Sequence, residues 1–111
     1  MDIDDITLNI FFIYCWKHKP KRCQCGCGKH LPDSLNKCCM DHTLDKSKYP
    51  ECKYSKSNIA YYTPDCHSRK TNGFFSNKQL EKYKEAIENY DFIKEESLKF
   101  EEKVKNKLYD K

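Results

Sequence analysis

The sequence has no apolar run long enough to cross a membrane, since the longest one, residues 10–16, is far too short. Its first residues, Met1 to Asp5, are acidic and have no signal-peptide character. It also contains no glycine-rich phosphate loop, no nucleophile elbow and no internal repeat. These absences exclude a membrane-spanning protein, the enzymes built around such loops and elbows, and repeat architectures.

The composition predicts one domain with a modest core, because 38% of the 111 residues are hydrophobic and 34% are charged. The eight cysteines indicate either a disulfide framework or metal sites. We favour metal, because the cysteines cluster with histidine and glycine and the Lys-rich surface suits an intracellular protein. We therefore expect the protein in the cytoplasm or nucleus.

The net charge of +4 is unevenly distributed. Residues 17–22 form a basic run, and Glu dominates after residue 80. Further cations lie in or beside the central stretch: Lys46, Lys48, Lys53, Lys56, Arg69 and Lys70. A basic front half suits a partner that carries phosphates, although an ordinary solvated Lys-rich surface is the alternative.

The stretch from Cys38 to Asn72 contains the residues most suited to chemistry. Residues 58–62 are apolar and aromatic and predict a strand. Thr63, Pro64 and Asp65 then predict the start of a short helix that Gly73 closes. That helix would carry Cys66, His67, Arg69 and Lys70.

A second strand is predicted over residues 36–41, which would deliver Asp41 and His42 at its end. Packed against the helix, this strand end would bring one Asp and two His residues near a single ion. An imidazole left free beside that ion could serve as a general base.

This pattern resembles the HNH nuclease family, which has an Asp-His pair, a middle Asn and a final His or Asn. Asp41-His42, Asn58 and the segment from Cys66 to Lys70 match that order at typical spacing: residues 43–57 separate His42 from Asn58, and residues 59–66 separate Asn58 from His67. Cys27 to Pro32 also looks like the knuckle that often opens such domains. The resemblance covers roughly residues 21–73.

The resemblance implies an α+β fold with a small, treble-clef-like ββα-metal core stabilised by zinc. It divides the chain into a packing segment with a basic linker (1–20), an HNH nuclease domain (21–75) and a long C-terminal helix (76–111). The implied function is hydrolysis of DNA phosphodiester bonds with Mg²⁺ or Mn²⁺. No element that reads bases is evident in the sequence, so no sequence preference follows.

The resemblance also implies a role for each residue of the motif. The catalytic group would be His42, Asn58 and His67. Asp41 and His67 would ligate the divalent ion, and neutral His42 would take a proton from the attacking water. Asn58 would hold the loop of the motif in position. Arg69 and Lys70 would bind neighbouring phosphates.

The cysteine and glycine cluster at residues 23–28 predicts a structural zinc site, because glycines let the backbone turn sharply between thiolates. The sequence departs here from the family, whose two CxxC pairs would place cysteines at Gln24 and Thr63. We favour Cys23, Cys25, Cys27 and Cys66 as ligands, with Cys38, Cys39 and Cys52 left open. The alternative is that zinc has been lost and these are buried, reduced thiols.

The two ends of the chain predict packing elements. An isoleucine stripe at Ile3, Ile6, Ile10 and Ile13 indicates a helix, with a buried strand over residues 10–16 as the competitor. Residues 76–79 form a capping box, Phe75 and Leu80 a hydrophobic staple, and one helix is predicted from there. Its apolar side would be Leu80, Tyr83, Ile87, Tyr90, Ile93, Phe100, Val104 and Leu108.

Two rival functions are open at this point. One is a non-catalytic, zinc-stabilised module that binds nucleic acid or protein. The other is a disulfide-rich secreted binder.

Overall fold

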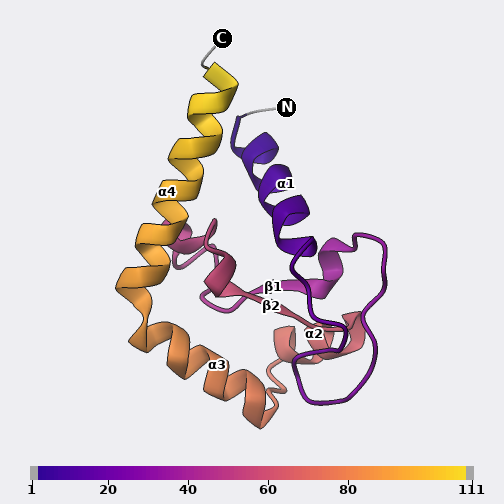
Figure 1. The fold of residues 1–111 in the computed structure, drawn as a ribbon. Coiled ribbons are helices and arrows are strands. Elements are labelled where there is room, and N and C mark those ends of the chain that lie inside the picture. The colour runs from indigo at the N-terminus through magenta and orange to yellow at the C-terminus, as the bar shows by residue number, and fades with distance from the viewer. Residues whose placement is uncertain (1–2, 110–111) are drawn as a thin grey trace.

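Two short antiparallel strands, β1 (Met40–His42) and β2 (Ile59–Tyr61), lie at the centre of the fold, which is α+β (Figure 1). The computed structural model describes residues 3–109. Four α-helices surround the hairpin: α1 (Ile3–Trp16), α2 (Pro64–Thr71), α3 (Asn77–Glu88) and α4 (Tyr90–Tyr109). Three single 3₁₀ turns lie between them: η1 (Lys37–Cys39), η2 (Pro50–Cys52) and η3 (Lys56–Asn58). Residues 1–2 and 110–111 of the predicted segments lie outside the described part.

The hairpin and the following helix agree with the sequence in outline. β2 lies within the predicted strand, and Pro64 begins α2 with Thr63 as its N-cap. Gly73 follows the helix at φ +92°, a conformation that favours glycine. The predicted strand over residues 36–41 is wrong in its first part. Asn36 instead caps η1 by accepting a hydrogen bond from the Cys38 backbone N–H, so β1 begins only at Met40.

Helix α1 includes residues 10–16, so the competing prediction of a strand there is wrong. Its buried face is also not the predicted isoleucine stripe, because Ile10 and Ile13 are exposed. Thr7, Phe11 and Cys15 are buried instead. The reason is ring packing: Phe11 meets Tyr54 at 5.8 Å and Phe100 of α4 at 5.3 Å between ring centroids. The side chains of Ile3 and Leu108 lie outside the described residues.

Helices α1 and α4 contact each other, and the hairpin lies below α1 and beside α4 (Figure 1). The capping box that begins α3 is present, with Ser76 and Gln79 each accepting a backbone hydrogen bond from the other residue. A long C-terminal helix is present as α4, but the prediction that it runs unbroken from residue 76 is wrong, because the chain breaks at Asn89 into α3 and α4. Asn89 donates its side-chain N–H to the Glu85 carbonyl at 2.9 Å and ends α3.

The predicted apolar side of the C-terminal segment is buried only in α4. Ile93 and Val104 are buried there, together with the polar residue Ser97. The α3 part is wrong, because Leu80, Tyr83 and Ile87 are exposed and Ala86 faces the core instead. Phe75 and Leu80, the predicted staple, are both about half exposed. The break at Asn89 turns α3 away from the axis of α4, so the two helices cannot share one stripe.

Residues 43–57 are folded onto α4 and do not form an open solvated loop. Ser97 accepts a hydrogen bond from the Tyr54 backbone N–H at 2.9 Å, and Glu96 accepts one from the Ser55 hydroxyl at 2.6 Å. Leu44, Cys52 and Tyr54 are buried. This packing fixes the segment that joins the two strands, so it sets where β1 ends and β2 begins.

We expect Phe11→Ala to lower the free energy of unfolding by about 3–5 kcal/mol, the usual cost of removing a buried aromatic ring. Phe11 is fully buried and contacts rings from two other segments. Urea denaturation followed by circular dichroism would measure the change. Ile13→Ala is the matched control on the same helix, because Ile13 is half exposed and should cost less than about 1 kcal/mol. Equal losses in the two variants would contradict this account of the core.

Candidate metal centre and active site

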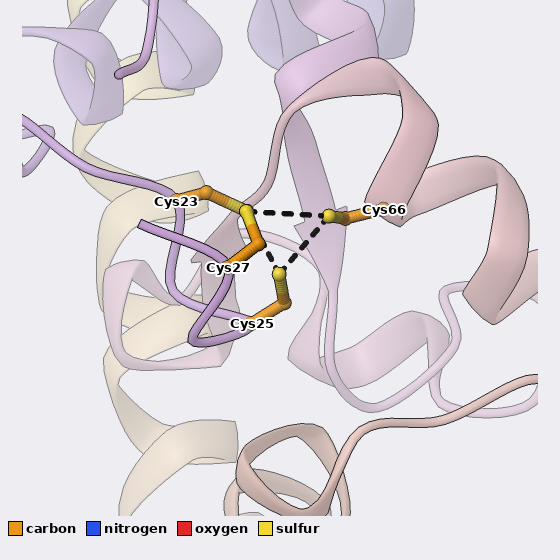
Figure 2. A group of neighbouring side chains, drawn as sticks. All are labelled: Cys23, Cys25, Cys27 and Cys66. Carbon is orange, nitrogen blue, oxygen red and sulfur yellow. Dashed lines mark hydrogen bonds between the residues drawn. The ribbon is translucent and has the colours of Figure 1, made fainter. Parts of the chain in front are cut away.

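Four cysteine sulfurs converge between the loop at residues 23–27 and the first turn of α2. The Sγ atoms of Cys23, Cys25, Cys27 and Cys66 all lie within 4.8 Å of one another. Figure 2 shows the three loop cysteines and Cys66 pointing toward a common centre. These are the four residues favoured from the sequence.

Two glycines shape the loop that carries three of these sulfurs. Gly26 and Gly28 have φ values of +96° and +79°, which residues with a side chain rarely adopt. The reversal is held by the Cys23 N–H, which donates to the Lys29 carbonyl at 2.8 Å, and by the Leu31 N–H, which donates to the Lys21 carbonyl at 2.9 Å. The chain therefore turns back within a few residues and presents alternate sulfurs to one side.

The two positions that depart from the family pattern have other tasks. Gln24 lies along β2: its N–H donates to the Tyr61 carbonyl at 2.8 Å, and its side-chain oxygen accepts from the Tyr61 N–H at 2.9 Å. The Thr63 N–H donates to Cys23 Sγ at 3.3 Å. Cys23 Sγ thus lies beside Thr63, where the second cysteine of the helix pair was expected, and Cys25 joins it in the cluster.

The geometry fits a tetrahedral ion. Four sulfurs about 2.3 Å from a central zinc would be about 3.8 Å apart. Three of the Sγ pairs here are 3.0, 3.2 and 3.6 Å apart, slightly closer than that, and all eight cysteines are free thiols. A sulfur-only set of four suits zinc, whereas Mg²⁺ and Mn²⁺ prefer oxygen.

The thiols of the cluster differ in acidity. The Lys29 backbone N–H donates to Cys27 and lowers the pKa of that thiol to about 7. Burial raises the pKa of the Cys66 thiol and is the main cause of the raised pKa of Cys25. Thiolates are the zinc ligands, so an ion must displace the protons of the buried thiols when it binds.

A second group lies where β1 meets α2. Asp41 Oδ1 is 3.2 Å from His67 Nε2, and Asp41 Oδ2 is 2.6 Å from Lys70 Nζ. The carboxylate and the lysine are both mostly buried. His67 Nδ1 lies 2.7 Å from the Cys38 carbonyl, to which it must donate, since a carbonyl only accepts. That bond fixes the ring and directs Nε2 at Asp41.

The charges of this group are mutually dependent. The hydrogen bond to Asp41 raises the pKa of His67. Burial alone would raise the pKa of Asp41, but the hydrogen bonds and charges of His67 and Lys70 outweigh it and lower that pKa. Asp41 is therefore ionised at neutral pH, and the group can offer one carboxylate and one imidazole to a cation.

His42 lies apart from this group, because consecutive residues of a strand face opposite sides. Its ring packs beside Phe11 and Phe12, with centroids 6.3 and 5.9 Å away. Its Nε2 donates to the Lys53 carbonyl at 2.8 Å. Burial is the main cause of its lowered pKa, so His42 is neutral at pH 7 and its Nδ1 is the ring nitrogen able to accept a proton.

Asn58 is fully buried and bonded to the chain that follows β1. Its side-chain oxygen accepts from the Leu44 N–H at 2.7 Å, and its amide nitrogen donates to the Leu44 carbonyl at 3.1 Å and to the Cys52 carbonyl at 3.3 Å. These bonds tie the end of β1 to the start of β2.

The two phosphate-binding candidates are placed differently. Arg69 is exposed in the last turn of α2, whereas Lys70 is turned inward onto Asp41. Sequence reasoning missed this ion pair, as well as the carbonyls of Cys38 and Lys53 that hold the two histidines. Backbone groups carry no residue-specific signal. The Asp41–Lys70 pair also had no signal in the sequence, because the strand and helix patterns do not reveal how β1 packs against α2.

Comparisons with protein-family models, with curated proteins and with solved structures find no match for this chain. The four-cysteine cluster and the Asp41 group must therefore be interpreted from their own geometry. Of the helices in residues 3–109, none is both long and apolar enough to span a bilayer.

We expect the purified protein to carry about one tightly bound zinc ion per chain, with four sulfur ligands. Cys25→Ser should lose most of this zinc, because serine is a poor zinc ligand, and it should also unfold the 23–31 loop. Atomic absorption and X-ray absorption spectroscopy would measure content and ligands. Cys38→Ser is the matched control, since Cys38 is exposed and outside the cluster. A metal-free wild type that melts cooperatively would contradict the site.

Proposed function

We propose that this chain is a metal-dependent endonuclease of the HNH type that hydrolyses DNA phosphodiester bonds. The observation that supports this best is the facing pair of Asp41 and His67, which joins the end of β1 to α2 at 3.2 Å. A hairpin followed by a helix, with a cysteine cluster joining that helix to the preceding loop, also supports the proposal. The pair would hold Mg²⁺ or Mn²⁺, and zinc would be structural.

The residues present fit such an ion. A carboxylate oxygen and an imidazole nitrogen already face each other, and the Cys38 carbonyl behind His67 is the kind of outer partner that orients a metal-bound histidine. Magnesium or manganese held there would neutralise negative charge that develops on the phosphate and the departing oxygen.

His42 is the proposed general base. Its Nε2 hydrogen is committed to the Lys53 carbonyl, which orients the ring and leaves Nδ1 to take a proton from water. Its neutral state at pH 7 suits that role. Asn58 acts as a positioning residue, because its bonds to Leu44 and Cys52 fix the segment that follows His42.

The zinc site would position the same machinery from the other side. Cys66 directly precedes His67, so a zinc–sulfur bond at Cys66 fixes the first turn of α2 against the 23–27 loop. That turn sets the direction from which His67 approaches Asp41. Arg69, exposed one turn further along α2, is available to a neighbouring phosphate of the DNA backbone.

A non-catalytic zinc-stabilised module that binds nucleic acid or protein is the second candidate. Two observations favour it. Lys70 already neutralises Asp41, and the His42 ring is packed among core aromatic rings. In such a module Asp41, His67 and Lys70 would be a structural ion-pair network.

The two functions are separated by cleavage of supercoiled plasmid with Mg²⁺, Mn²⁺ or a chelator. If the nuclease proposal holds, His42→Ala should slow cleavage by roughly 10²–10⁴-fold, as expected for loss of a general base. His18→Ala is the control, because His18 is exposed on the linker. DNA affinity and zinc content should be unchanged in both variants. If the wild type cuts the plasmid with neither Mg²⁺ nor Mn²⁺, the binding module is favoured.

Cleavage should rise with pH as His42 loses its proton, with a midpoint below the ordinary imidazole pKa of about 6.5. The sign follows from burial, which disfavours the charged ring and lowers the pKa of His42. Rates should be measured at saturating Mn²⁺, so that protonation of His67 does not limit the ion. A midpoint well above 6.5 would contradict the assignment of His42 as the base.

A further inference from the structure

The Lys70 ammonium lies beside Asp41, at the place where the proposed divalent ion would bind. Its Nζ is 2.6 Å from Asp41 Oδ2, while His67 Nε2 is 3.2 Å from the other oxygen of the same carboxylate. The lysine side chain is only 16% exposed, which is unusual for a residue that normally extends into water. Both oxygens of Asp41 thus face side chains of α2, but Oδ2 is buried and makes no aligned hydrogen bond, so only the charge of Lys70 compensates it.

The local structure directs Lys70 inward. It follows His67 by three residues, so both side chains leave α2 on the same face. After the helix the chain reverses at Gly73 and places the Phe75 ring 5.9 Å from Lys70 Nζ. The reversal is held by the Phe74 N–H, which donates to the Arg69 carbonyl at 2.8 Å. The ammonium is therefore enclosed between a carboxylate and an aromatic face.

We propose that the Lys70 ammonium is a built-in placeholder for the divalent ion, which must displace it from Asp41 in order to bind. The inference rests on the proposed function, since it takes Asp41 and His67 as the ligands of Mg²⁺ or Mn²⁺. A lysine held on one ligand oxygen lowers the apparent affinity for the ion by the fraction of time that the oxygen is free. Once released, the Lys70 ammonium is next to Arg69 in the chain and can reach a DNA phosphate.

This arrangement has two physical consequences. Without an ion the mostly buried carboxylate is not left uncompensated, because the Lys70 ammonium supplies positive charge. With an ion alone, however, the displaced ammonium must find another anion or water. A phosphate of the substrate supplies that anion. Metal and DNA should therefore bind cooperatively, each favouring the state in which Lys70 has left Asp41.

The test is Mn²⁺ binding to the zinc-loaded protein, measured by the electron paramagnetic resonance signal of free Mn²⁺. Lys70→Met keeps the length of the side chain and removes its charge, and we expect it to tighten Mn²⁺ binding by on the order of tenfold or more. Lys46→Met is the charge-matched control. Lys46 is exposed and its charge reaches the neighbouring His42, so it should change the affinity by less than about threefold.

A measurement on the wild type makes the test independent of whether the variant folds. When Mg²⁺ is added with a DNA duplex that carries phosphorothioate linkages, Lys70 is expected to leave Asp41 and pair with a phosphate of the DNA. Mg²⁺ alone should already raise acetylation of the Lys70 amine several-fold, as read by mass spectrometry. Lys29 is the internal reference, because it is about half exposed and its ion pair is with Asp65.

The outcomes separate this inference from the proposed function. If Lys70→Met binds Mn²⁺ no more tightly than wild type, and Mg²⁺ leaves Lys70 acetylation unchanged while Asp41→Asn abolishes Mn²⁺ binding, the placeholder role is wrong but the ion site stands. If neither wild type nor Lys70→Met binds Mn²⁺, both the ion site and the placeholder are overturned.

Discussion

The meeting of four cysteine sulfurs between the 23–27 loop and α2 is the constraint on which the site depends. The hairpin has only three residues in each strand, and the loop before it has no helix or strand of its own. A metal ion can fold such a segment, because its binding energy is folding energy in small domains. Cys66 and His67 are adjacent, so whatever fixes the sulfur of one also fixes the imidazole of the other.

Strand geometry then distributes the remaining chemistry over two faces. Asp41 and His42 are consecutive in β1, so one side chain faces α2 and the other faces the aromatic residues of α1. The first face is polar and holds charge between a carboxylate, an imidazole and an ammonium. The second is apolar and keeps a histidine neutral by burial.

The sequence predicted best where local chemistry decides the structure. The N-cap and proline at residues 63–64 and the capping box at 76–79 act over a few residues and were predicted correctly. The four favoured cysteines also converge, while their role as zinc ligands stays a prediction. The sequence failed where packing between distant segments decides. The buried face of α1 is set by Tyr54 and Phe100, and the break at Asn89 has no strong signal because Asn is tolerated inside helices. The roles of Asp41, His42, Asn58 and His67 stay predictions.

The motif that the sequence resembles would place cysteines at Gln24 and Thr63, but in this chain other positions supply the sulfurs. Gln24 adds a backbone and side-chain pairing to β2, while Cys23 supplies its sulfur from one residue earlier and is met by the Thr63 N–H. Four sulfurs converge here, although their spacing differs from the motif that the sequence resembles. A site with four sulfur ligands needs only that the sulfur atoms converge. Two glycines with positive φ let the loop bring its cysteines together although they do not have the CxxC spacing. Spacing rules therefore describe one solution to this geometry, and Cys23 shows a second.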